Sequence, residues 1–161
     1  MRNWLGRFFG RGEPTVNEAN TRDAPRLAVL HAASFHRGWS EDEFERLLIE
    51  RNVLAHCARA GRSIIGFIMS RMVSGEAEIL SVAVASSHRG RGIAGRLLDV
   101  HLRRLAGLGT KTVFLEVEED NASACRLYAH ARFREVGRRK GYYPRTNNQA
   151  ATALILRRDL V

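Results

Sequence analysis

The stretch that decides the fold runs from residue 81 to residue 98 and reads SVAVASSHRGRGIAGRLL. An apolar, strand-like run leads into the segment Gly90–Gly95, and residues with helical spacing follow it. Glycines let the backbone come close to a phosphate, and the start of a helix offers free N–H groups and the positive end of its dipole. The stretch therefore predicts a site for a phosphate-bearing ligand. A glycine-rich turn that only starts a helix is the alternative, but it does not account for Arg89 and Arg91.

The same segment spells G-x-G-x-x-G, the pattern of a dinucleotide-binding turn, and an acidic residue, Glu116, follows 21 positions after Gly95. Three features argue against a dinucleotide. Residues 86–89 separate the strand from the first glycine, antiparallel hairpins precede the motif, and the chain that follows is too short for a full domain of about 150 residues. We therefore expect a different phosphate ligand.

The composition describes one ordinary globular domain that is strongly basic. The chain has 161 residues, a formal net charge of +9 and a pI of about 10.9. Such a charge favours polyanionic partners, which include ribosomal RNA, anionic lipid and a phosphorylated cofactor, but no motif for specific nucleic-acid recognition is present. No apolar run approaches the roughly 20 residues of a membrane span. Cys57 and Cys125 form no CxxC pair, so we expect small buried thiols and a cytoplasmic protein.

The first residues differ from the rest of the chain. Residues 1–12 read MRNWLGRFFGRG, with three arginines, no acid and two apolar pairs that are four positions apart. On a helix these pairs share one face, although Gly6 and Gly10 weaken that helix. Two interpretations remain open, a frayed tail and a segment that docks on a membrane surface or a partner. We expect a basic N-terminal extension over residues 1–13 and one folded domain over residues 14–161.

The remaining pattern predicts an α/β fold. Helical patterns begin near Asp23 and after the capping box Ser40–Glu43, and a third follows the glycines and ends near Gly107. A shorter helix follows Asp120–Asn121. The predicted strands are 53–58, 63–72, 78–85, 112–117, 133–139 and 153–158, with tight turns between the first three and a loop around 142–144 between the last two. We therefore expect a mixed, mostly antiparallel sheet flanked by helices.

These residues resemble a known family. The segment Arg89–Ala94 reads R/Q-x-x-G-x-G/A, which is similar to the acetyl-CoA pyrophosphate loop of the GNAT N-acetyltransferases. Three further patterns resemble the RimI-type ribosomal-protein-alanine N-acetyltransferases: Gly38-Trp39-Ser40, Leu115-Glu116-Val117 with Asn121 and Leu127-Tyr128, and Tyr142-Tyr143-Pro144. The resemblance runs from about residue 14 to the end of the chain. It implies a GNAT fold whose sheet opens at the coenzyme, and acetyl transfer from acetyl-CoA to the N-terminal alanine of a small-subunit ribosomal protein.

The resemblance also implies roles for two titratable residues. Glu116 would be the general base, and Tyr128 would be the general acid that protonates the thiolate of coenzyme A. Both residues have simpler interpretations. Glu116 is a lone acid in an apolar strand and could pair with an arginine, and Tyr128 could be a packed helix residue with its hydroxyl at the edge. Asn121 could cap its helix, contact coenzyme A, or do both.

Other residues are assigned by the same resemblance. Cofactor contacts are expected from Val82, Ala83, Val84, Arg89, Gly90, Arg91, Gly92, Ile93, Ala94, Gly95 and Asn121, and substrate contacts from Trp39, Tyr142 and Tyr143. The histidines have no metal-ligand spacing, so no metal is expected.

Two alternative functions remain open: a GNAT enzyme that acts on a small amine such as a polyamine, and a non-catalytic acyl-CoA-binding module. Residues 149–152 read QAAT where RimI-type sequences usually carry an acidic pair, which argues against a polyamine site. Gly38 also differs from RimI-type sequences, in which a proline is common before the Trp-Ser pair.

Overall fold

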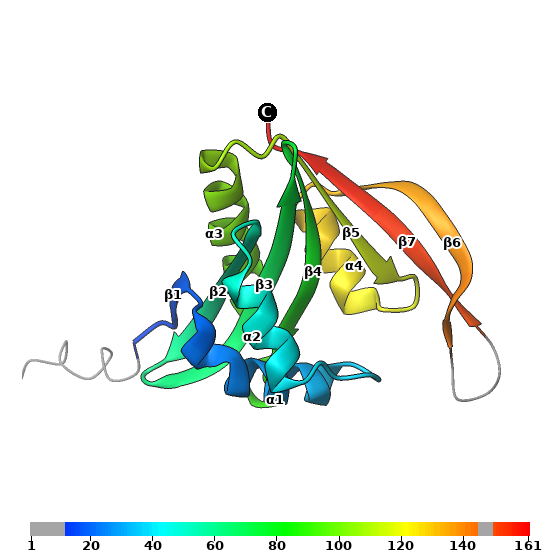
Figure 1. Cartoon of the computed structure of the whole chain (residues 1–161). Helices are drawn as coiled ribbons and strands as arrows, with labels where there is room; N and C mark the ends of the chain where they lie inside the picture. Colours follow the sequence, from blue (N-terminus) through cyan, green and yellow to red (C-terminus); the bar gives the residue numbers. More distant parts are fainter. Residues whose placement is uncertain (1–11, 145–149) are drawn as a thin grey trace, which may run out of the picture.

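The computed structural model describes residues 12–144 and 150–161. The predicted amphipathic segment at the N-terminus therefore lies outside the described residues. One seven-stranded sheet has the order β1-β2-β3-β4-β5-β7-β6, and its neighbours are antiparallel except for β4 and β5 (Figure 1). The strands are β1 (Thr15–Glu18), β2 (Val53–Ala60), β3 (Ser63–Val73), β4 (Glu76–Val84), β5 (Thr112–Glu118), β6 (Arg134–Pro144) and β7 (Ala150–Asp159).

Helices cover both faces of this sheet, so the protein has two apolar clusters. The helices are α1 (Ala24–Ser34), α2 (Glu41–Ile49), α3 (Ile93–Gly107) and α4 (Ala122–His130). Leu97, Leu98 and Leu105 of α3 pack on one face, together with Tyr128 of α4. On the other face, α1 and α2 form a cluster around Phe44. In Figure 1, α1 and α2 lie in front of the sheet, α1 against β3 and β4 and α2 against β2, and no helix of the described residues lies in front of β5, β7 and β6.

The sheet opens between β4 and β5. Their pairing is limited to three residue pairs, from Glu76 with Thr112 to Glu78 with Phe114. Beyond these pairs β4 continues along β3 and β5 continues along β7, so the two strands diverge toward their carboxyl ends (Figure 1). A register shift between Met69 and Ser70 of β3 places a bulge in β4 next to Leu80, and a bulge bends the strand that carries it. The V-shaped opening expected from the resemblance is therefore present.

Most predicted elements are confirmed. Helix α1 occupies the expected range, and in the capping box the Ser40 hydroxyl accepts from the N–H of Glu43 at 3.2 Å while the Glu43 carboxylate accepts from the N–H of Ser40 at 2.7 Å. Strand β1 was not predicted, because four residues with one apolar side chain carry no clear periodicity. Its place is decided by antiparallel pairing with β2.

The predicted loop around residues 142–144 is wrong. Strand β6 continues to Pro144, which pairs with Ala150, and Tyr143 pairs with Ala151. The register shifts between Arg139 and Tyr143, and Gly141 in this interval has a φ of 71°. A bulge with glycine in the left-handed region lets a strand bend without ending. Gly141 and Pro144, which indicated a loop in the sequence, here belong to a bent strand.

Both cysteines are free thiols, but only one fits the expectation of burial. Cys57 is completely buried, and burial raises the pKa of its thiol to about 12. Cys125 is half-buried on α4. Over the described ranges, no helix is both long and apolar enough to cross a membrane.

Candidate active site

The glycine loop lies between the end of β4 and the start of α3. Gly90 and Gly92 have φ angles of 75° and 77°, a backbone region that L side chains rarely adopt, and open space surrounds both positions. Gly92 is the N-cap of α3, and no side chain caps this helix end. A hollow of about 210 Å³ adjoins the loop, and Arg91 and Arg96 line it together with Glu13, whose Oε2 lies 3.3 Å from Nη1 of Arg96. This end of α3 therefore combines accessible backbone donors with positive charge.

The expected contact of Arg89 with the cofactor stays a prediction, and its side chain contacts other groups of the protein. Its Nε donates to the carbonyl oxygen of Val84 at 3.1 Å, and its Nη2 donates to the Ser34 hydroxyl at 3.3 Å. These bonds connect the end of β4 to the end of α1. The structure thus gives the Arg89 side chain a role in holding the loop in place, whereas Arg91 is exposed beside the glycines.

The edge of β4 that faces β5 lacks a strand partner along its second half. Ala83 and Val82 pair with Phe67 and Ile68 of β3. The other edge of β4 therefore faces the opening. Val84 packs with α3, while Ala83 belongs to the cluster around α1 and α2. Ser81 in this part of the strand has a buried hydroxyl with no hydrogen-bond partner among the described residues. Buried polar groups are normally paired, so this end of β4 suits a bound partner.

Glu116 lies on β5 and points away from α3 and α4. Its neighbours Leu115 and Val117 are buried in the cluster around those helices, and the alternation of a strand directs Glu116 to the opposite face. The side chain is 23% exposed, and its Oε1 lies 3.3 Å from Nη2 of Arg139 on β6. The ion pair that was one interpretation of Glu116 is therefore present. The carboxylate also remains accessible to water at the opening of the sheet.

Asn121 and Tyr128 are positioned by α4. Asn121 is the N-cap of α4, where its side chain accepts from the N–H of Ala124 at 3.2 Å. Tyr128 is only 7% exposed, and its ring packs edge-on against Phe133 with centroids 5.6 Å apart. Burial raises the pKa of Tyr128 to about 12. The phenol therefore keeps its proton at neutral pH.

The end of α4 is held by a Schellman motif. The N–H of Phe133 donates to the carbonyl of Tyr128 at 2.9 Å, and the N–H of Arg132 donates to the carbonyl of Ala129 at 3.0 Å. Arg132 occupies the left-handed position of this motif with a φ of 65°, where glycine is usual. The structure thus holds Tyr128 by its carbonyl as well as by its ring.

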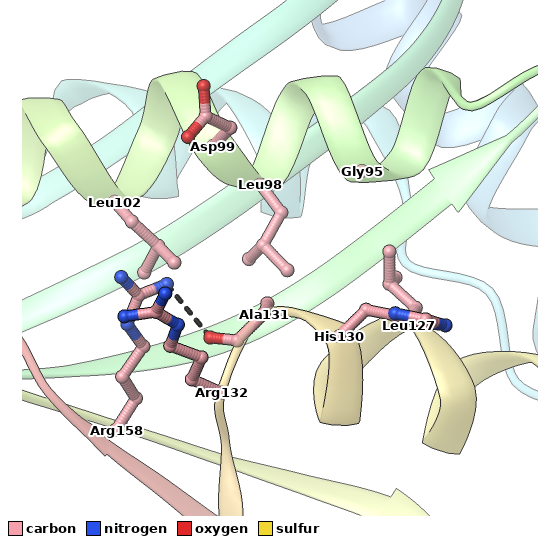
Figure 2. Close-up of a pocket in the computed structure, with 9 residues that line it drawn as sticks. All are labelled: Gly95, Leu98, Asp99, Leu102, Leu127, His130, Ala131, Arg132 and Arg158. Atoms are coloured by element: carbon pink, nitrogen blue, oxygen red, sulfur yellow. Dashed lines mark hydrogen bonds between the residues drawn. The ribbon is translucent and has the colours of Figure 1, made fainter.

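A groove of about 270 Å³ lies beside this motif, between α3 and α4. Figure 2 shows Leu98 and Leu102 of α3 on one side and the end of α4 on the other, with Arg158 of β7 donating to the carbonyl of Ala131 at 2.8 Å. This bond ties the end of α4 to the sheet. Sequence patterns did not reveal it, because the two residues are far apart in the chain.

The predicted substrate residues are divided between two regions. Trp39 is half-buried between α1 and α2, and its backbone N–H donates to Nδ1 of His31 at 3.0 Å. The side chains of Tyr142 and Tyr143 lie outside the described residues. Sequence patterns did not single out His31 or Arg139, since neither belongs to a motif and their partners, Trp39 and Glu116, lie outside their own elements. No cluster of three or more potential metal ligands occurs within the described part of the chain.

Comparisons with known proteins agree with this geometry. Residues 19–133 match the model of the acetyltransferase (GNAT) family. The chain is 34% identical over 154 residues to the N-alpha-acetyltransferase RimI of Mycobacterium tuberculosis, covering 91% of this chain and 94% of that protein. It is 28% identical over 135 residues to the ribosomal protein bS18-alanine N-acetyltransferase of Escherichia coli, covering 84% and 90%. A crystal structure of the ribosomal-protein-S18-alanine N-acetyltransferase from Escherichia coli superposes with a TM-score of 0.85 at 26% identity, covering 91% of this chain and 94% of that one.

Proposed function

Since this chain belongs to the acetyltransferase (GNAT) family, we propose that it moves the acetyl group of acetyl-CoA to the α-amine of a protein N-terminus. The observation that carries the proposal is the opening between β4 and β5. The uncapped glycine loop lies at the β4 side of this opening, Glu116 lies on β5 with its side chain toward one face, and Tyr128 packs in the cluster on the other face.

The residues fit acetyl-CoA at three points. Gly90–Gly95 and the first N–H groups of α3 suit the pyrophosphate, with Arg91 and Arg96 beside them. The unpaired edge of β4 at Val82–Val84 offers backbone groups to an extended chain such as pantetheine. Asn121 lies at the N-terminus of α4, where it supports a further contact with the coenzyme. Acetyl-CoA supplies a thioester, whose acyl carbon is open to attack by an amine.

Two residues of this chain handle the protons. An α-amine has a pKa near 8 and a lysine amine near 10.4, so deprotonating a lysine near pH 7 costs about 3 kcal/mol more. Glu116, acting through a water molecule, is sufficient for the α-amine. The amine nitrogen then bonds to the acyl carbon, and the carbon–sulfur bond breaks. Glu116 accepts the proton that the amine loses, and Tyr128 donates its proton to the departing sulfur.

The two substrates approach from opposite faces. Glu116 projects to the face that carries α1 and α2, whereas α3 and its glycine loop belong to the other face. The acceptor peptide is therefore expected on the α1/α2 side, near Trp39 and the β6–β7 hairpin that carries Tyr142 and Tyr143.

The relatives' names indicate the acceptor. The Escherichia coli relative is named a ribosomal protein bS18-alanine N-acetyltransferase, and we propose the N-terminal alanine of such a ribosomal protein as the acceptor, and therefore a cytoplasmic protein, for this chain. Its net charge of +9 would favour nonspecific attraction to ribosomal RNA. We further propose that residues 1–13 form an extension to a catalytic domain of residues 14–161, and that the basic extension serves docking, including contact with a membrane surface.

The release of coenzyme A tests this function. Purified protein receives acetyl-CoA with one of three acceptors: a peptide that begins Ala-Arg, the same peptide with a blocked N-terminus, or spermidine. Turnover with the free peptide alone supports the proposal. Turnover with spermidine alone would instead indicate a small-amine acetyltransferase. Thermal stabilisation by acetyl-CoA without any turnover would indicate a binding module.

Single variants test the two proton-handling residues. Glu116→Gln and Tyr128→Phe should each lower kcat/KM for the peptide by at least about 10²-fold, because general catalysis typically contributes that much. Glu50→Gln is a matched control, since Glu50 also pairs with an arginine, Arg71 at 3.1 Å, and has no part in the proposed mechanism. If Glu116 serves only as an ion-pair partner, Glu116→Gln would cost about 1 kcal/mol of stability or less and leave turnover unchanged.

A further inference from the structure

His31 occupies an unusual position for a titratable side chain. It lies on α1, is only 3% exposed, and its ring is stacked between two aromatic rings. The centroids of Phe35 and Trp39 lie 4.4 Å and 4.5 Å from that of His31, and Phe44 packs edge-on at 5.6 Å. The Nδ1 atom accepts the backbone N–H of Trp39 at 3.0 Å. One imidazole thus joins α1, the segment that follows it, and α2.

These contacts organise the segment 35–40, which connects α1 to α2 without regular structure. The carbonyl of His31 accepts the N–H of Phe35 at 3.0 Å, and its ring accepts the N–H of Trp39. His31 therefore binds the segment at both ends. The ring can do so only when Nδ1 carries no proton, and burial keeps the ring neutral by lowering the pKa of His31 to about 4.

The segment 35–40 lies on the side of the sheet where the acceptor is expected. Trp39 packs in the same cluster as Leu80 and Ala83 of β4, next to the divergence of β4 and β5. Arg89 connects Ser34, at the end of α1, to the carbonyl of Val84 at the end of β4. In Figure 1 the connection between α1 and α2 lies at the bottom of the molecule, the end toward which β4 and β5 diverge. A shift of this segment would therefore change the surface next to the divergence of β4 and β5.

We propose that His31 is a positioning residue for acceptor binding, whose ring nitrogen Nδ1 holds Trp39, and through it the segment 35–40, in the arrangement that the acceptor peptide meets. The inference rests on the proposed function. It assigns to His31 no contact with the reacting atoms, so it concerns the affinity for the acceptor and not the chemical step.

Two substitutions separate the ring nitrogen from the ring faces. His31→Phe keeps an aromatic ring between Phe35 and Trp39 but leaves the partly buried N–H of Trp39 without its present acceptor. His31→Asn places an amide oxygen near the position of Nδ1 and loses the stacking. His130→Asn, an exposed histidine at the end of α4, is the control.

Steady-state kinetics with both substrates give the decisive measurement. His31→Phe should raise KM for the free-amine peptide about tenfold, while kcat and KM for acetyl-CoA stay within about twofold, because an unsatisfied buried donor is costly. His31→Asn should restore most of the loss, and His130→Asn should change nothing. In parallel, hydrogen exchange of the Trp39 amide should be fast in His31→Phe and slow in His31→Asn and in the unmodified protein.

The outcomes distinguish the inference from the function on which it rests. Two results with His31→Phe would overturn the role of His31 alone. One is a normal kcat with an unchanged KM for the peptide. The other is a fall in kcat that equals the rise in both KM values. Absence of any free-amine turnover by the unmodified enzyme would refute the proposed function and, with it, a role in acceptor binding. If His31→Phe does not fold, His31→Asn decides: a protected Trp39 amide with a peptide KM within about threefold supports the proposal, and a tenfold rise contradicts it.

Discussion

Acidification from about pH 7.5 to about pH 5.5 should lower the free energy of unfolding, because buried imidazoles are neutral in the folded protein. His101 of α3 is completely buried, and its Nδ1 lies 2.8 Å from Nδ1 of His56 on β2 while its Nε2 lies 2.7 Å from the Ser70 hydroxyl. Burial, with a further contribution from His56, lowers the pKa of His101 to about 3. Burial lowers the pKa of His31 to about 4.

The size of the effect follows from proton linkage. Each of these histidines has a pKa of about 6.5 in the unfolded chain, so in this range the unfolded state binds more protons than the folded state. The contribution of each neutral histidine to the free energy of unfolding is therefore fully present above about pH 6.5, and it is lost progressively as the pH falls below that value. Over this pH range the loss is about 1.4 kcal/mol for one histidine and nearly 3 kcal/mol for His31 and His101 together. Burial also lowers the pKa of His56, although Glu18 partly opposes this shift. His56 therefore adds to the loss of stability at the lower pH.

Urea denaturation followed by circular dichroism at the two pH values measures this loss. Asp159, whose pKa is lowered from 3.8 by the bond from Arg157, titrates below the range and does not contribute. In His101→Leu, the loss of unfolding free energy between the two pH values should be smaller by about 1.4 kcal/mol. This holds however much the substitution destabilises the protein at about pH 7.5. His36→Asn changes an exposed histidine and should leave the dependence intact. Equal or greater stability at the lower pH would refute the assignment of neutral buried histidines.

Three further predictions concern packing and reactivity. Arg132→Gly should raise the urea midpoint by the equivalent of up to about 1 kcal/mol, because glycine removes the strain of a φ of 65°, and a lower midpoint would contradict this. Gly66→Ala should cost about 1–3 kcal/mol in the same assay, because its Cβ would lie 3.1 Å from the Ala83 carbonyl oxygen and 3.2 Å from Leu97; an unchanged midpoint would show that the sheet yields easily. A thiol reagent should modify Cys125 but leave Cys57 unmodified until the protein is unfolded, since Cys57 is buried with a raised pKa, and rapid reaction of both thiols in the folded protein would argue against that burial.

Local features of the site could be predicted because their signals lie within a few consecutive residues. The glycines at 90 and 92, the capping box at Ser40 and the cap at Asn121 depend on backbone geometry within one turn. The family resemblance also depends on such short patterns.

Contacts over long distances in the sequence could not be predicted in this way. The pairing of Glu116 with Arg139, the bond from Trp39 to His31 and the His56–His101 contact each join residues from different elements. Nothing in the periodicity of either element specifies the partner. The β6 strand shows the same limit, because Gly141 and Pro144 indicate a loop locally, whereas pairing with β7 keeps the chain extended.

The sequence by itself determined the order of helices and strands from α1 to β7, the glycine loop at the start of α3 and the membership in an α/β class. These follow from short-range periodicity, capping and backbone freedom, which act between near neighbours in the chain. Only the tertiary structure decided where the sheet opens, which face Glu116 occupies and which residues surround His31. Those outcomes depend on strand register and on the packing of two helical layers, and both arise from contacts between segments that the chain brings together only when it folds.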